Sequence, residues 1–473
     1  MKSLQIKMTT TNLKSLNMKK HLLYIFLIVS QIAFADVRLP SILTDHMVLQ
    51  QKSEVKLWGW SDPDEEIVIT PSWSATAYKV KGSNQAYWET IITTPSAGGP
   101  FTISFKGNNT LILNDILIGE VWLCSGQSNM EMSAAWGIEN GEEEVKNANQ
   151  PTIRFYTAPK ISAKFPQLNI VSQWEICSPI SMKKNSALAY FFAKRLQEVD
   201  PDVPVGLIIS AWGGTPAETW MPEEVINNDT LLLKTANSLK PVPWGPVEPA
   251  RTFNAMINPL IDYTIAGALW YQGEANVGSN NYTHTLPALI KSWRNLWKND
   301  FPFYIVQIAP YQYGENNFNG AIIRDAQRVV SMEIPNTDMV ITSDISTIDD
   351  IHPKDKKTVG IRLANLALTK HYKKNNDLVN GPSFKKISVT KNKVNVYFDY
   401  AEGLYFNNKQ LLFEVAGDDG NFYPAKAKVF KETIKVSSKK VKNPTKVRFA
   451  WGNTVQSNLF NKANLPASTF ITK

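Results

Sequence analysis

Five short apolar runs that alternate with amphipathic segments limit the fold of this chain more than any other feature. They are EVWLCS (120–125), VGLIIS (205–210), IAGALWYQ (265–272), FYIVQIA (303–309) and TDMVITSD (337–344). Segments with apolar residues three and four positions apart, typical of a helix with one buried face, lie at 186–199, 285–297, 321–332 and 358–368. Because a strand that is apolar throughout must be covered on both faces, this alternation predicts a parallel sheet with helices on both sides. The predicted fold is a doubly wound α/β domain.

The regions on either side of this pattern have a different texture. Short β-type runs separated by turn residues occupy 36 to about 115 and return from about 382. With 473 residues, of which 43% are hydrophobic, the chain is long enough for two or three domains. We predict an N-terminal β-domain over 36–115, the α/β domain over 116–378 and a β-sandwich-like domain over 379–473. The crossovers at 133–185 and 212–260 carry many Trp, Pro and Asn residues, so we expect loops that shape a site.

Residues 1–35 have the pattern of a signal peptide. Lys19 and Lys20 precede the apolar run LLYIFLIVSQIAF, and Ala33-Phe34-Ala35 is a small-x-small cleavage site. The run has 13 residues, whereas a helix needs about 20 to cross a bilayer. We therefore expect an exported protein, periplasmic or extracellular, that is not inserted in a membrane after cleavage.

The charge of the chain argues against a nucleic-acid partner. The formal net charge is +8, but the leader contributes five Lys and no acidic residue, so the rest carries 45 basic and 42 acidic residues. A nucleic-acid-binding chain would show a basic stripe interleaved with aromatic residues, and none stands out. Cys124 and Cys177 are the only cysteines; an exported chain could pair them, or Cys124 could be a small buried hydrophobe.

Polar residues follow the ends of the predicted strands. In an open α/β sheet the ligand lies outside the carboxyl ends of the strands, where such residues converge. They include a serine, two glycines with free amides, side-chain amides, carboxylates and a histidine, which are the parts of an acyl-transfer site. These residues are Ser128, Gly213, Gly214, Glu218, Trp220, Gln272, Glu274, Asn276, Asp349 and His352.

His352 is the base by elimination if Ser128 is a nucleophile. The remaining histidines lie in the leader, in the N-terminal β-domain or beside predicted helices, away from the strand ends. Asp349 lies three residues before His352 and can orient the ring across one turn, with Asp350 as the competing carboxylate. Each residue alone has an ordinary structural explanation, since a serine after a strand is usually a turn residue or a cap. Their convergence at one sheet edge favours catalysis.

Four longer motifs carry a resemblance to a known family. Ser128 lies in GQSNM, so the G-x-S-x-G elbow of the α/β-hydrolases is absent. The segments GEVWLCSGQSNMEM, GLIISAWGGTPAETWMP, ALWYQGEAN and DIHPKDKKTVGIRLA are similar to the sialate O-acetylesterase family, within the SGNH-type esterases. The resemblance runs from residue 39 to about 372.

The resemblance implies a serine esterase without metal or cofactor. Ser128 would be the nucleophile, His352 the base and Asp349 its partner. The oxyanion hole would consist of the Ser128 amide, a glycine amide from Gly213-Gly214 and the Gln272 side chain, with Asn276 as a substitute for Gln272. Glu274 would orient His352 or bind sugar hydroxyls.

The implied substrate is an O-acetylated sugar or glycan. Sialic acid comes first, and acetylxylan or another polysaccharide is the alternative. Arg251 is a candidate partner for a sialic acid carboxylate, although a structural salt bridge would also explain it. Some of Trp136, Trp212, Trp220, Trp244 and Trp270 could stack on sugar rings. A non-catalytic glycan-binding protein and a metal-dependent hydrolase are weaker alternatives, the latter because His and carboxylate residues are not at metal-ligand spacing.

Overall fold

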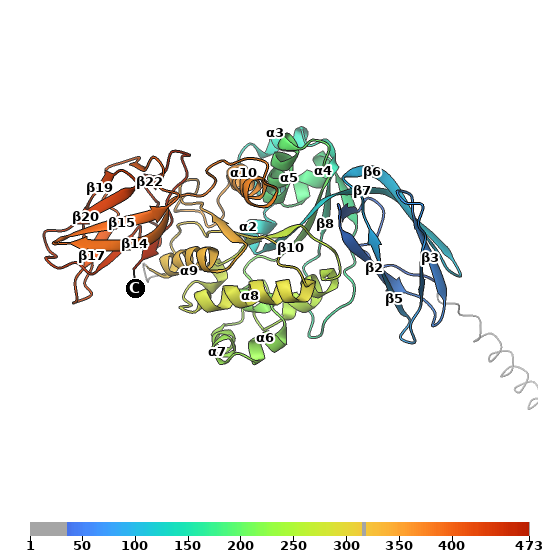
Figure 1. Ribbon diagram of the computed structural model, residues 1–473. Helices are drawn as coiled ribbons and strands as arrows, with labels where there is room; N and C mark the ends of the chain where they lie inside the picture. Colours follow the sequence, from blue (N-terminus) through green and yellow to red (C-terminus); the bar gives the residue numbers. More distant parts are fainter. Residues whose placement is uncertain (1–35, 315–317, 473) are drawn as a thin grey trace, which may run out of the picture. The chain divides into compact units, whose positions relative to one another are not determined.

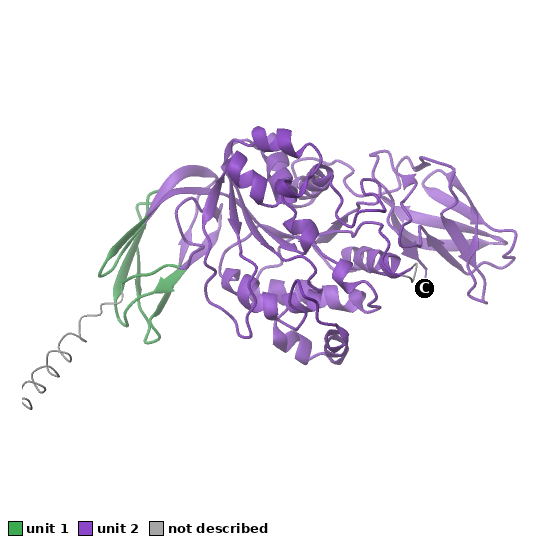
Figure 2. Cartoon of the chain, turned by 180° about the vertical axis from the view of Figure 1, so that it is seen from behind, with its two compact units in different colours: residues 1–39, 58–90, 104–112 green, residues 40–57, 91–103, 113–473 purple. Residues whose placement is uncertain are grey.

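The computed structural model describes residues 36–314 and 318–472 of the chain. The predicted leader, residues 1–35, lies outside them. The described residues divide into two compact units (Figure 2). The smaller comprises residues up to 39 with 58–90 and 104–112, and the larger comprises 40–57, 91–103 and the chain from 113 onward. No described helix is long and apolar enough to cross a membrane.

A largely parallel sheet is the centre of the larger unit. Its strand order is β13-β12-β11-β7-β10-β8-β9, and every neighbouring pair is parallel except β8 with β9. All five predicted strands are confirmed. Their bounds are β7 Thr110–Gly126, β10 Val205–Ala211, β11 Gly267–Tyr271, β12 Phe303–Val306 and β13 Thr337–Val340. The core around the sheet contains both cysteines, which are buried and unpaired, so they serve as small hydrophobes.

Two strands lie where the sequence predicted only a loop. β8 (Gln150–Thr157) pairs with β10, and β9 (Trp174–Cys177) pairs with β8. The expectation of a loop over 133–185 was therefore wrong for these residues. Arg154 interrupts the apolar pattern of β8, yet it is buried because the Asp115 carboxylate accepts from its two terminal nitrogens at 2.8 and 3.2 Å. A partner 39 positions away cannot be recognised from local periodicity.

Helices cover both faces of the sheet (Figure 1). α5 and α10 pack on one face, while α8 and α9 lie on the other. The four predicted helices are confirmed, with bounds α5 Ala187–Val199, α8 Tyr282–Trp297, α9 Asn319–Glu333 and α10 Lys356–Leu366. Ser186 caps α5 and Asp355 caps α10 through side-chain oxygens that accept backbone N–H groups. The shorter helices are α2 Ser128–Glu131, α3 Gly141–Lys146, α4 Pro179–Lys184, α6 Glu223–Asn227 and α7 Thr230–Ser238.

The remaining strands lie before and after the parallel sheet in sequence. Those before it are β1 Val48–Gln50, β2 Glu54–Trp60, β3 Glu66–Pro71, β4 Tyr78–Lys81, β5 Tyr87–Thr93 and β6 Gly98–Lys106. After it, β14 Ser383–Thr390, β15 Lys393–Asp399, β20 Thr433–Ser437 and β19 Lys426–Phe430 form one antiparallel sheet. A second contains β18 Tyr423–Pro424, β17 Phe413–Ala416, β21 Lys446–Phe449 and β23 Phe470–Ile471, and β16 Tyr405–Phe406 pairs with β22 Leu459–Phe460. One apolar cluster joins these strands.

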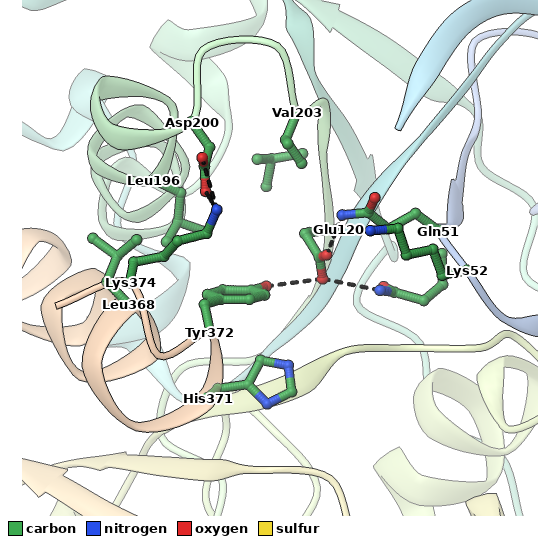
Figure 3. A pocket seen from close by; sticks show the side chains of 12 residues that line it. Gln51, Lys52, Glu120, Leu196, Asp200, Val203, Leu368, His371, Tyr372 and Lys374 are labelled. Atoms are coloured by element: carbon green, nitrogen blue, oxygen red, sulfur yellow. Dashed lines mark hydrogen bonds and ion pairs between the residues drawn. The ribbon is translucent and has the colours of Figure 1, made fainter. Parts of the chain in front are cut away.

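A hollow of about 410 Å³ lies where the parallel strands begin (Figure 3). Its centre is the buried Glu120, whose carboxylate accepts from Gln50 at 2.9 Å, Gln51 at 2.7 Å and the Tyr372 hydroxyl at 2.9 Å. The same hydroxyl accepts from the Trp122 indole at 2.9 Å. Neighbouring side chains already bind this carboxylate. We therefore interpret the hollow as part of the structural packing at the edge of the sheet opposite to Ser128.

Candidate active site

Three parallel strands end side by side and bring their following residues together. Gly126 of β7 pairs in register with Ala211 of β10 and with Tyr271 of β11. A Cβ at Gly126 would lie 2.2 Å from the Tyr271 carbonyl oxygen, and its φ is +133°. Only glycine allows β7 to end this close to β11. The chain then turns into α2, whose first residue is Ser128.

Ser128 and His352 form a hydrogen-bonded pair at this edge. The distance between Ser128 Oγ and His352 Nε2 is 2.8 Å. His352 lies in the irregular segment between β13 and α10, and the Trp136 ring is nearly perpendicular to its ring, at 89°, with the centroids 6.1 Å apart. When the ring is neutral and protonated at Nδ1, Nε2 can accept the serine proton. The arrangement can therefore activate the hydroxyl.

The carboxylate closest to the His352 ring belongs to Asp350, not to the predicted Asp349. Asp350 Oδ1 lies 3.9 Å from Nδ1 and accepts the backbone N–H of His352 at 2.8 Å. This local turn, in which an aspartate binds the backbone two residues ahead, draws Asp350 toward the ring. Within the described part of the chain, no hydrogen bond or ion pair joins Asp349 to His352.

Burial lowers the pKa of His352 from its ordinary value of 6.5. The positive charge of Lys356 lowers this pKa further, while the negative charges of Asp350 and Glu131 oppose the shift. The net shift is downward. The ring is consequently neutral, and able to act as a base, at neutral pH and somewhat below it.

A cavity of about 640 Å³ opens in front of the pair. It is lined by parts of the crossovers and by residues that follow the strand ends. Three of the five tryptophans considered from the sequence lie on it, and two others are in the core. The lining residues that matter below are Gln127, Ser128, Glu131, Trp136, Lys160, Trp212, Gly213, Gly214, Lys240, Trp244, Glu274 and His352.

Trp244 forms an aromatic wall of this cavity. Its side chain is 60% exposed, and its carbonyl accepts from the Trp212 indole at 2.8 Å. A Cβ at Gly214 would lie 2.1 Å from the Trp244 indole nitrogen, and Gly214 has a φ of +74°. The second glycine of the pair thus lets the tryptophan lie against the strand end.

Two residues that line the same cavity have backbone amides suited to an oxyanion. Ser128 and Gly214 line it, and in the described structure their N–H groups have no acceptor. The Gly213 N–H donates to Glu131 Oε2 at 3.0 Å, and Glu131 also binds Lys160 at 2.8 Å. Gly213 is therefore available to a ligand only if this contact with Glu131 opens.

The two predicted side-chain donors to the oxyanion are already engaged. Gln272 is fully buried, and its Nε2 donates to Asn276 Oδ1 at 2.7 Å and to the Thr215 carbonyl at 3.2 Å. Its Oε1 accepts from the Tyr282 hydroxyl at 2.6 Å. Asn276 donates to the buried carboxylate of Glu218 at 2.9 and 3.2 Å. In this structure both amides hold the turn after β11 together, and neither lies on the lining of the cavity.

Two of the predicted substrate-binding residues also lie elsewhere. Trp220 is fully buried, and its indole donates to Thr215 Oγ1 at 2.9 Å. Arg251 is not part of the lining of the cavity. Glu274 does line it, although burial raises the pKa of its carboxyl to about 7.

Several residues of the cavity were not predicted from the sequence. Gln127 precedes the nucleophile candidate and lines the cavity. Its position in the GQSNM motif was the only sequence feature that could have indicated this. Glu131 follows shortly after, whereas Lys160 and Lys240 lie in the crossovers, whose course depends on tertiary contacts. Over the described residues, no group of three or more His, Cys, Asp or Glu side chains is placed to hold a metal ion.

Known proteins of one family are similar to this chain. The family model of the carbohydrate esterases described as sialic acid-specific acetylesterase matches residues 118–369. The chain is 31% identical over 427 residues to the sialate O-acetylesterase of Homo sapiens, covering 80% of each chain, and 28% identical to that of Mus musculus, covering 76% and 78%. A crystal structure of a carbohydrate acetylesterase from Xanthomonas citri superposes with a TM-score of 0.84 at 31% identity, covering 92% of this chain and 99% of the other. The chain therefore belongs to the sialic acid-specific acetylesterase family of carbohydrate esterases and is a carboxylic ester hydrolase.

Proposed function

We propose that this protein is an exported serine esterase that removes O-acetyl groups from sialic acid. Acetylxylan or another acetylated polysaccharide is the alternative substrate. The observation that carries the proposal is the 2.8 Å hydrogen bond between Ser128 Oγ and His352 Nε2 in a cavity with aromatic walls. Export is proposed from the leader pattern of residues 1–35.

In the proposed reaction Ser128 Oγ attacks the acetyl carbonyl carbon while His352 Nε2 takes its proton. The tetrahedral intermediate collapses as His352 returns that proton to the sugar oxygen, which leaves as an alcohol. Water, deprotonated by His352, then attacks the acetyl-serine, and His352 returns this proton to Ser128 Oγ as acetate leaves. The N–H groups of Ser128 and Gly214 stabilise the oxyanion, and Gly213 joins them when Glu131 moves away.

Two features of the cavity support an acidic sugar as the substrate: exposed aromatic rings for the sugar and a lysine for its acid group. Trp136 and Trp244 offer exposed faces against which a sugar ring can pack. Lys240 lines the cavity with no carboxylate partner in the described structure, whereas Lys160 is paired with Glu131. A free ammonium group suits the carboxylate of a sialic acid, the role that the sequence suggested for Arg251.

Acetate release from three substrates tests this proposal. O-acetylated sialic acid should give the highest kcat/KM, acetylxylan a lower value, and methyl acetate, which has no sugar ring, the lowest. Trp244→Ala should raise KM for the sugar substrate about 3- to 10-fold, the effect of losing one aromatic contact, with little change for methyl acetate. Trp244→Phe is the matched control and should recover most of the affinity. A higher kcat/KM for acetylxylan would favour the alternative substrate. If Trp244→Ala changed KM equally for all substrates, Trp244 would not be a sugar-binding residue.

The aspartate that serves His352 can be identified with two single variants. We expect Asp350→Asn to lower kcat by a factor on the order of 10² to 10⁴, because its carboxylate is the one near Nδ1. Asp349→Asn is the matched neighbour and should stay within a few-fold of wild type. The reverse result would return the role to Asp349, as its position three residues before His352 suggested.

A further inference from the structure

Three buried polar side chains lie directly behind the Ser128 and His352 pair. They are Asn129, which follows Ser128 and is 0% exposed, Lys356, which is 1% exposed, and Glu274. Lys356 Nζ donates to Asn129 Oδ1 at 2.6 Å, and Asn129 Nδ2 donates to Glu274 Oε1 at 2.7 Å. The Asn129 amide thus stands between a buried cation and a buried carboxyl group.

The same amide also connects the two halves of the catalytic pair. Asn129 Nδ2 donates to the Ile351 carbonyl at 3.0 Å, and Ile351 immediately precedes His352. The segment that carries His352 has no helix or strand of its own between β13 and α10. Its position relative to Ser128 therefore depends on side-chain contacts such as this one.

The contacts of Lys356 are unusual for a buried lysine. A buried ammonium is normally stabilised by a directly paired carboxylate. In the described part of the chain, no carboxylate oxygen lies within 4.0 Å of Lys356 Nζ, which binds the Asn129 amide and lies 5.2 Å from the centre of the Tyr271 ring. The ammonium is thus directed at the residue next to the nucleophile.

We propose that Lys356 is a positioning residue of this esterase. Its ammonium fixes the Asn129 amide in the orientation that fastens the Ile351 carbonyl, and so keeps His352 within reach of Ser128. Its charge also disfavours protonation of His352. This proposal rests on the proposed serine mechanism, which it extends to a residue that touches neither the substrate nor the reacting atoms.

The charge of Lys356 should change the pKa of His352 in one direction. His352 faces Lys356, Asp350 and Glu131, and Lys356 itself faces Glu274, Asp350 and Asp355. Burial lowers the pKa of Lys356 to about 7, and these three acids oppose that shift. Removing the positive charge should raise the pKa of His352, because the imidazolium form is then less disfavoured. The acid limb of the pH profile should move to higher pH.

The test compares Lys356→Met with Lys357→Met on the wild-type background. Lys357 is the adjacent residue, but it binds Glu144 at 2.8 Å outside the cavity, so it matches the loss of one lysine without touching the pair. Folding of each variant is checked by circular dichroism. We expect Lys356→Met to lower kcat roughly 10- to 100-fold with a smaller change in KM, and to shift the acid limb upward by roughly half a unit to one unit. Lys357→Met should behave as wild type.

A double-mutant cycle separates positioning from a general loss of stability. Asn129→Leu removes the amide at similar volume, and Lys356→Met combined with Asn129→Leu should lose little more than Asn129→Leu alone if both residues act through one connection. If Lys356→Met does not fold, Lys356→Gln, which keeps a donor for Asn129 without the charge, carries the same pH test.

Two outcomes would overturn the proposal. One is a folded Lys356 variant with the kcat and pH profile of Lys357→Met, and the other is a loss of activity that follows the folded fraction with no shift of the acid limb. Ser128→Ala, measured in the same assay, distinguishes failure of the serine mechanism from failure of the role of Lys356. If Ser128→Ala is as active as wild type, the serine mechanism itself fails; if it is inactive while Lys356→Met is normal, only the role of Lys356 fails.

Discussion

Ser128→Ala is expected to lower kcat for acetate release by a factor on the order of 10⁴ to 10⁶, because no other hydroxyl is hydrogen-bonded to His352 in the described structure. The fold should be unaffected, since among the described residues the lost oxygen makes no other hydrogen bond. Initial rates with O-acetylated sialic acid and methyl acetate check this.

A serine outside the cavity provides the control for this variant. Ser388 lies on β14 and is exposed, so Ser388→Ala should keep the wild-type rate. Turnover by Ser128→Ala within a few-fold of wild type on both substrates would contradict the nucleophile assignment.

His352→Gln is expected to lower kcat by a factor on the order of 10³ to 10⁵, since the serine then lacks a base. For wild type, the neutral ring is the active form, and burial together with Lys356 places the pKa of His352 below 6.5. The wild-type kcat/KM should therefore rise with pH to a half-maximum below pH 6.5 and level off above it. The residual activity of His352→Gln should lack this limb.

His284 is the matched control for this second variant. It forms a 2.7 Å contact with Asp229, so it is also a histidine beside a carboxylate, but it does not line the cavity. His284→Gln should keep both the rate and the acid limb. A limb that persists in His352→Gln would show that another group titrates.

The parallel sheet could be predicted because burial on both faces leaves a local signal. Each of the five central strands contains a short apolar run, and each of the four predicted helices repeats its apolar residues at helical spacing. β8 escaped prediction because Arg154 lies within it, and the residue that makes its burial tolerable, Asp115, is far away in sequence. The convergence of residues at one edge of the sheet followed from the fold class.

The site was only partly predictable, because side-chain partners are a tertiary property. The structure brings together Ser128 and His352, as the strand ends suggested. Gln272 looked like a free donor, but Tyr282 and Thr215, from two other segments, bind its amide. Trp220 and Trp244 are the same residue type in neighbouring segments, yet one is core and the other is a wall of the cavity.

Lys356 is a further residue whose partners could not be predicted from the sequence. In the sequence it is one of several lysines in PKDKK, and nothing local marks it as buried. Only the fold shows that its ammonium contacts the residue after Ser128, while its neighbour Lys357 is half exposed in an ordinary ion pair.

Covalent labelling by a fluorophosphonate tests the serine mechanism most directly, because this reagent modifies only a serine activated by a base. The protein is incubated with the reagent, its remaining esterase activity is followed in time, and its peptides are then mapped by mass spectrometry. We predict one adduct per chain, on Ser128, forming at the rate at which activity is lost, and none in His352→Gln over the same period. Loss of activity without an adduct on Ser128, or an adduct on another residue, would contradict the assignment.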